Sequence, residues 1–239
     1  MKKIFIYSFM LGIAMFGLTS CNDDNDELTD SKITYYVNLE MQGDEFVQVP
    51  IGSVYNDAGC TATENGADVT SSIVTTGLDA VDVNKAGLYT VTYSAVNKDG
   101  FPASVSRTVA VCDPSITTDL SGSWTTQGGT QRVYGGATVT PFPDYTISIT
   151  KAAPGIFYVS DLFAGYYDQR AGYGSSYACR GYIQLLADNS LVCLSSSVAG
   201  WGDSLDDDTF TGNYDPATGT LTWDEGYAGA MTFHIILNQ

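Results

Sequence analysis

The residues best suited to chemistry in this sequence are the tyrosines of residues 163–182. That segment reads FAGYYDQRAGYGSSYACRGY, with five tyrosines, four glycines and no clean period. Flat apolar rings stack on the CH groups of sugars, and interleaved polar groups bind the hydroxyls. The pattern has two interpretations: the tyrosines cover the end of a β-barrel, which is the simpler and favoured one, or the segment is a glycan-binding loop. The candidate ligand-binding residues are Tyr166, Tyr167, Asp168, Arg170, Tyr173, Tyr177 and Trp201.

No arrangement of residues predicts catalysis. His234 is the only histidine, and it alternates with Phe233 and Ile235 on a predicted strand, which favours a structural role. A Ser-His-Asp or Cys-His site would have to include it, and no G-x-S-x-G nucleophile motif is present. We expect no enzyme activity, no catalytic residue and no cofactor; a hydrolase using scattered carboxylates is the minor alternative.

Two groups of acidic residues have types that occur in calcium sites and in glycosidase active sites. Residues 203–208 read DSLDDD and favour a solvated turn, because the glycine and distal glutamate of an EF-hand loop are missing; calcium binding is left open. Asp224 and Glu225 follow Trp223, but neighbours on a strand point to opposite faces. The carboxylates of a glycosidase must flank one bond from the same cleft, so this pair does not predict one.

Four cysteines follow the N-terminal segment: Cys60, Cys112, Cys179 and Cys193. Four cysteines allow three pairings, of which pairing within each half of the chain is the simplest. A hairpin turning at residues 188–189 would place Cys179 opposite residue 198 and Cys193 opposite residue 184, so a bridge there needs another register. The spacing excludes close CxxC pairs, and we expect no structural metal site.

Charge narrows the range of partners. The 239 residues hold 27 acidic and 10 basic side chains, a net charge of −17. Nucleic-acid binding needs a basic face that neutralises phosphates, and electrostatic docking on anionic lipid needs a basic patch. Both are therefore unexpected.

The first 20 residues read as a signal peptide. Lys2 and Lys3 precede an apolar run over residues 4–18, which is short for a membrane span. The run ends in LTSC and resembles the lipobox of bacterial lipoproteins, which implies that Cys21 is lipidated and anchors the protein to the membrane. No later apolar segment reaches spanning length.

Residues 21–32 form a predicted acidic tether that begins CNDDNDE. Such a polar run is typical of a solvated linker. It also resembles the acidic run of Bacteroidetes lipoproteins exported to the outer face of the outer membrane, which implies a location on the cell exterior.

Residues 33–114 predict a small β-sandwich. Runs at 34–37, 46–50, 88–95 and 105–111 are rich in β-formers, the last two alternate strictly, and NKDG at 97–100 reads as a turn. VYNDAGCTA at 54–62 and KAGLYTVTYSA at 85–95 resemble a bacterial immunoglobulin-like domain of surface lipoproteins. That resemblance implies a spacer with no chemistry of its own.

Residues 115–239 predict an antiparallel β-barrel or sandwich of about seven or eight strands, so the whole chain is expected to be all-β. The opening L-x-G-x-W over residues 120–124 is similar to lipocalin-like barrels. This half also resembles the C-terminal domain that accompanies the immunoglobulin-like module in Bacteroidetes lipoproteins.

These observations favour a non-enzymatic surface lipoprotein that binds a polysaccharide or assists glycan uptake. The alternative is a structural subunit that contacts an outer-membrane transporter and binds no small ligand.

Overall fold

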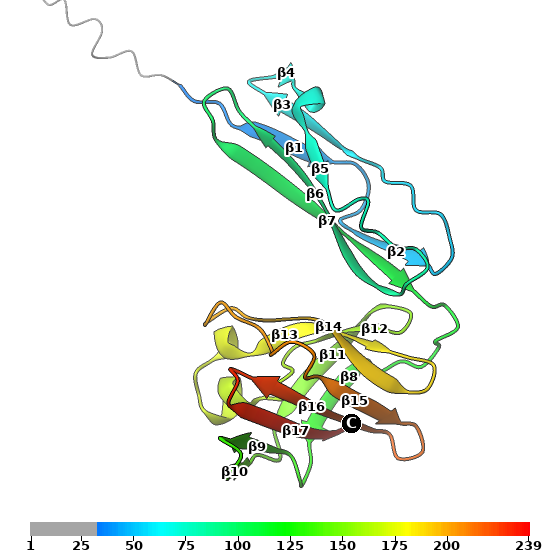
Figure 1. Cartoon of the computed structure of the whole chain (residues 1–239), viewed down its shortest axis with the longest axis vertical. Coiled ribbons are helices and arrows are strands. Elements are labelled where there is room, and N and C mark those ends of the chain that lie inside the picture. Colours follow the sequence, from blue (N-terminus) through cyan, green and yellow to red (C-terminus); the bar gives the residue numbers. More distant parts are fainter. Residues whose placement is uncertain (1–32) are drawn as a thin grey trace, which may run out of the picture. The chain divides into compact units, whose positions relative to one another are not determined.

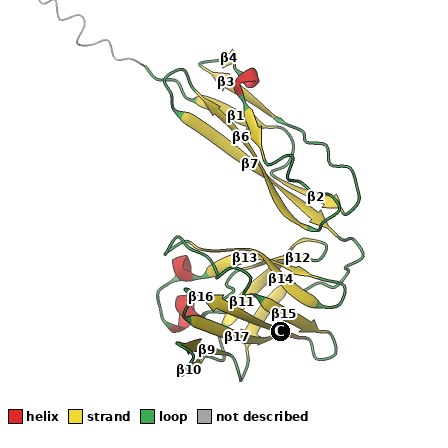
Figure 2. Ribbon diagram, viewed as in Figure 1, coloured by secondary structure: helices red, strands yellow, loops and turns green. Residues whose placement is uncertain are grey.

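The computed structural model describes residues 33–239, and strands dominate it (Figures 1 and 2). The predicted signal peptide, Cys21 and the acidic tether lie outside the described residues. The expectation of an all-β chain is confirmed: an immunoglobulin-like region precedes an antiparallel barrel. Within the described part, no helix has the length and apolarity to cross a bilayer.

The immunoglobulin-like region contains two sheets, ordered β1-β3-β4 and β2-β7-β6-β5. Strict alternation over residues 88–95 produces a long strand whose inward side chains, including Val91 and Tyr93, are fully buried. The predicted strand at 34–37 is largely wrong, because pairing begins only at Val37. The strands are β1 (Val37–Met41), β2 (Phe46–Pro50), β3 (Cys60–Glu64), β4 (Ala67–Asp68), β5 (Val74–Thr76), β6 (Gly87–Val96) and β7 (Pro102–Cys112).

A buried ion pair joins β7 to the segment between β2 and β3. Arg107 on β7 is 1% exposed and donates to the carboxylate of Asp57. The hydroxyl of Tyr93 donates to the same carboxylate at 2.6 Å, and that of Tyr55 at 2.9 Å. Arg107 also donates to the carbonyl of Asp44 at 3.0 Å. The side chains of Arg107, Tyr93 and Tyr55 therefore all have the Asp57 carboxylate as a partner.

Eight strands of the second half, β8 and β11 to β17, close into an up-and-down barrel. Each of these strands pairs with the next barrel strand, so that β8 pairs with β11, and β17 returns to β8 through Leu237↔Thr126 and Asn238↔Thr125. A hairpin, β9–β10, is added to the edge of β17 and was not predicted from the sequence. The strands are β8 (Gly122–Thr126), β9 (Gln131–Tyr134), β10 (Thr138–Pro141), β11 (Thr146–Ala153), β12 (Ile156–Val159), β13 (Cys179–Leu185), β14 (Ser190–Val198), β15 (Thr211–Asp215), β16 (Thr220–Tyr227) and β17 (Met231–Asn238).

The barrel interior is filled by side chains, as expected for eight strands. Trp124 and Trp223 are fully buried, and each indole N–H donates to a backbone carbonyl, of Leu120 at 2.8 Å and of Leu162 at 3.0 Å. Alternate residues of β16 point inward, so Trp223 and Glu225 are buried while Asp224 is exposed. The prediction that these two carboxylates face opposite sides is confirmed.

The β13–β14 hairpin decides the question of a disulfide in the barrel. Cys179 pairs with Val198, as predicted, but the turn holds three residues (187–189) instead of two, because the Leu186 N–H donates to the Ser190 carbonyl at 2.9 Å. Cys193 therefore lies opposite Ile183 instead of residue 184, and a bulge after Tyr182 restores the predicted register. Ile183 is four residues from Cys179, so at about 3.3 Å per residue the two cysteine Cα atoms are about 13 Å apart. A disulfide needs less than about 7 Å. All four described cysteines are free thiols, so the expected pairing within halves is not found.

We expect all four thiols to be detected without reductant when residues 22–239 are unfolded in denaturant and titrated with a thiol reagent. In the folded chain the barrel thiols should react slowly, because Cys179 is fully buried and burial raises the pKa of Cys193 to about 11. A reduced sample is the control. A smaller count before reduction than after it would contradict the free-thiol assignment.

Candidate ligand site at one end of the barrel

The site is built on the segment between β12 and β13. Ala164 and Gly165 adopt positive φ angles of 50° and 86°, which reverse the chain into a single π-helical turn, η3 (Tyr166–Arg170). A short 3-10 turn, η4 (Ser175–Tyr177), follows. The predicted irregular segment is therefore a sequence of tight turns, positioned between two barrel strands.

The carboxylate of Asp161 fixes this segment from inside. It accepts backbone N–H bonds from Phe163 at 3.0 Å, from Gly165 at 2.8 Å and from Cys179 at 2.8 Å. These bonds tie the start of the segment to the start of β13. Asp161 is only 2% exposed, and it was not singled out from the sequence.

A second buried carboxyl lies in the same interior. Glu225 is 1% exposed, and both its oxygens have no hydrogen-bond partner within residues 33–239. Burial, followed by the nearby charge of Asp161, raises the pKa of Glu225 well above 4.5. Burial also raises the pKa of Asp161 to about 7, although its three backbone hydrogen bonds act in the opposite direction. The barrel thus favours protonated carboxyl groups in its interior.

The structure places the seven candidate residues at two depths. Tyr166 and Tyr167 are buried at 5% and 7% exposure and pack edge-to-face against each other and against Phe233. They belong to the barrel core and offer no ring face to solvent. The alternative that tyrosines cover the barrel end therefore holds for these two.

The outer layer consists of Trp201, Tyr173 and the partly buried Tyr177. Trp201 is 42% exposed and Tyr173 is 56% exposed. The Trp201 ring lies 4.8 Å from the centroids of Tyr167 and Tyr177 and 6.1 Å from that of Tyr173. An exposed aromatic surface is thus supported from beneath by buried rings, and it matches the predicted joining of Trp201 to the tyrosine segment.

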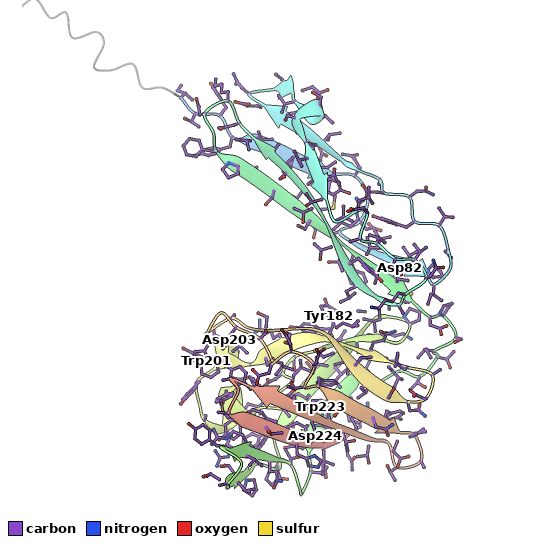
Figure 3. The ribbon with its side chains drawn as sticks, viewed as in Figure 1. Asp82, Tyr182, Trp201, Asp203, Trp223 and Asp224 are labelled. Carbon is purple, nitrogen blue, oxygen red and sulfur yellow. The ribbon has the colours of Figure 1, made fainter. Side chains whose placement is uncertain are left out.

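Close packing around Trp201 depends on a small neighbour. A Cβ atom added to Gly200 would lie 2.7 Å from the ring of Tyr177, and the Gly200 N–H donates to the carbonyl of Ser176 at 2.7 Å. The loop that carries Trp201 is therefore fastened to η4. Figure 3 shows Trp201 beside Asp203, whose carboxylate accepts the Tyr227 hydroxyl at 2.8 Å.

The charged candidates lie at the edge of these rings. Arg170 is exposed, and its guanidinium lies 5.3 Å from the centroid of Tyr166. Asp168 is partly buried in η3. The structure thus brings all seven predicted residues to one end of the barrel, with five of them reaching its surface.

The other groups discussed above lie elsewhere. His234 is 41% exposed, and its Nδ1 lies 2.7 Å from the Asp224 carboxylate on the outside of the barrel. Asp206 to Asp208, Cys193 and Phe210 line a groove of about 500 Å³ beside β14, to which no ring of the aromatic site contributes. Within residues 33–239, no three His, Cys, Asp or Glu side chains come together to hold a metal ion.

Comparison with known proteins gives the chain two family matches. A family model of a C-terminal domain matches residues 113–239, and one of a bacterial surface protein immunoglobulin-like domain matches residues 39–111. The crystal structure of the lipoprotein BT2262 from Bacteroides thetaiotaomicron is 44% identical in sequence. The match covers 85% of this chain and 100% of that one, with a TM-score of 0.49.

More distant structures come from ZmpB of Clostridium perfringens. A catalytic domain with two carbohydrate-binding modules is 18% identical over 53% of this chain and 14% of that one, with a TM-score of 0.28. A module in complex with GlcNAc is 21% identical over 52% and 28%, with a TM-score of 0.27. No curated protein matches the chain.

Proposed function

The chain belongs to the family of the lipoprotein BT2262 from Bacteroides thetaiotaomicron, and from this premise we propose that it is a non-enzymatic, glycan-binding lipoprotein of the outer cell surface. Lipidation at Cys21 would anchor it to the outer membrane. The acidic tether and the immunoglobulin-like region would act as a spacer that carries the barrel.

One observation supports glycan binding above the others. The exposed rings of Trp201 and Tyr173 lie edge-to-face, with an interplanar angle of 82°, on a support of buried rings, so their positions are fixed before any ligand arrives. Preorganised aromatic surfaces lose little conformational entropy on binding, which is what weak stacking on sugar CH groups requires. Polar groups at the edge, including Asp168 and Arg170, would bind hydroxyls.

Affinity electrophoresis of residues 22–239 through gels containing diverse polysaccharides tests this proposal. We expect one class of polymer to retard the chain, and Trp201→Ala to reduce the retention by about tenfold or more, because it removes the largest exposed ring. Tyr173→Ala should reduce it less.

The matched control is Tyr36→Ala, which removes a ring that is 65% exposed in the immunoglobulin-like region. Near-UV circular dichroism establishes that each variant is folded. Uniform mobility through every gel would contradict glycan binding. It would instead favour a structural subunit, and pull-down of outer-membrane transporter proteins would then be the next measurement.

A further inference from the structure

Three of the four basic side chains in residues 113–239 lie in or beside the aromatic segment: Arg132, Arg170 and Arg180. The same stretch holds 13 acidic side chains, so a cationic patch is unusual here. A chain of net charge −17 gains nothing in solubility from gathering its few cations at one place. Their position therefore needs a local explanation.

Arg132 and Arg170 converge on one ring. The guanidinium of Arg132 lies 4.9 Å from the centroid of Tyr166, and that of Arg170 lies 5.3 Å from it. Arg132 also lies over Tyr134 at 5.6 Å. Stacking on aromatic rings holds a guanidinium in place while leaving its N–H groups at the ring edge available to an acceptor.

Neither arginine is neutralised. Among residues 33–239, neither Arg132 nor Arg170 forms an ion pair with a carboxylate, and the buried Nε of Arg132 has no hydrogen-bond partner. Asp168 lies in the same turn as Arg170 without pairing with it. Two like charges beside one ring repel each other, and a bound anion would relieve that repulsion.

The arginine pair and the exposed rings rest on the same two buried tyrosines. Tyr166 lies 4.9 Å from Tyr167, and Tyr167 lies 4.8 Å from Trp201. Arg132 also reaches the sulfur of Met231 at 3.8 Å, the same atom to which the Tyr167 hydroxyl donates at 3.0 Å. A polymer lying on Trp201 would thus extend toward both guanidiniums.

We propose that this end of the barrel recognises acidic polysaccharides, with Arg132 and Arg170 binding the carboxylate or sulfate groups of a chain whose sugar rings stack on Trp201 and Tyr173. This inference rests on the proposed function and specifies its ligand class. Arginine suits both anions, because its planar fork donates two parallel hydrogen bonds.

Polysaccharides that share a sugar backbone but differ in charge separate recognition of the anionic groups from recognition of the sugar rings. Residues 22–239 are run through gels containing polygalacturonate or its methyl ester, and dextran sulfate or dextran, so that each pair differs only in its anionic groups. We expect retention by a charged member and none by its neutral partner, with a loss of retention as salt rises. The two pairs distinguish a carboxylate ligand from a sulfate ligand.

Arg170→Gln should weaken retention by the charged polymer by at least about tenfold, the usual effect of losing a charge-assisted hydrogen bond. Arg170 is exposed, so this variant should fold normally. Arg132→Lys should weaken retention as well, because it keeps the charge but loses the planar fork. Lys151→Gln removes the same charge from β11 and should have no effect.

Three outcomes would overturn this inference. Equal retention by charged and neutral partners, abolished by Trp201→Ala but not by Arg170→Gln, would overturn this inference and leave glycan binding standing. Equal loss in Lys151→Gln would show non-specific charge attraction and would also overturn it. Mobility unaffected by all four polymers would overturn this inference, whereas glycan binding is contradicted only if the wider panel of polysaccharides also leaves the mobility unchanged.

Discussion

Glu225→Gln is expected to stabilise the folded barrel by roughly 1–3 kcal/mol above neutral pH, and to leave its stability near pH 4.5 almost unchanged. Both oxygens of Glu225 are buried without a hydrogen-bond partner in the described part of the chain. A charge in that position is costly, whereas a protonated glutamate and a glutamine are nearly equivalent.

The barrel is expected to lose stability as the pH rises, because folding raises the pKa values of its two buried carboxyl groups. Burial raises the pKa of Glu225 above 4.5 and that of Asp161 to about 7, so the folded barrel retains protons that the unfolded chain has lost. Stability from these groups is fully present below their ordinary pKa values and is lost as the pH rises through the folded values. For Asp161, a rise of the pKa from 3.8 to about 7 on folding corresponds to about 4 kcal/mol of the free energy of unfolding, which is lost as the pH rises through that range.

Tryptophan fluorescence during urea unfolding, measured from pH 4.5 to pH 8, checks this expectation. All three tryptophans, Trp124, Trp201 and Trp223, belong to the barrel, so their signal reports its unfolding alone. Asp224→Asn is the matched control, because it alters the neighbouring carboxylate on the outer face. Parallel pH profiles for the wild-type chain and Glu225→Gln would show that Glu225 is not held protonated.

A larger effect is expected in the immunoglobulin-like region from Asp57→Ala, which should destabilise it by about 3–5 kcal/mol. The change leaves the Arg107 charge buried without a counter-charge and removes the acceptor of the Tyr93 and Tyr55 hydroxyls. Although burial opposes it, hydrogen bonding from the tyrosines and the charge of Arg107 hold the pKa of Asp57 below 3.8. The ion pair therefore contributes at neutral pH and weakens only in acid.

Far-UV circular dichroism during denaturant unfolding follows the strands of both regions, and tryptophan fluorescence in the same samples follows the barrel alone. The difference between the two transitions measures the change in the immunoglobulin-like region. Asp44→Ala is the control, because Arg107 donates to the backbone carbonyl of Asp44, which this variant keeps. Replacing Arg107 by Met in the Asp57→Ala background should restore part of the lost stability. If the double variant is no more stable than Asp57→Ala, the stranded charge is not the cause of the loss.

Strands with a clear apolar face were predictable from the sequence, and the β9–β10 hairpin was not. Alternation over residues 88–95 locates β6 closely, because one side of that strand is buried. Neither strand of the β9–β10 hairpin has a buried residue, so the apolar period that would reveal it is missing. The sequence likewise contains no sign that the turn before β14 holds three residues, which shifts Cys193 by one position.

The candidate site was predictable as a segment but not as a surface. Tyr166, Tyr167 and Tyr173 are the same residue type, and the backbone reversal at Ala164 and Gly165 decides which rings enter the core. Glu225 occupies an inward position of β16 that its period of two predicts, yet its charge argues for an outward one. Only the closed barrel shows that the pattern overrides the charge.

The way β17 closes the barrel also governs the order in which this chain folds. β17 pairs with β16 next to it in sequence, but its contact Leu237↔Thr126 joins residues more than a hundred positions apart. Local hairpins form within microseconds, while closure must wait for this distant pairing and for the loss of chain entropy that it entails. The rate-limiting step of barrel folding is therefore expected to be the docking of β17 onto β8, and before that step both strands have exposed edges to which another chain can add.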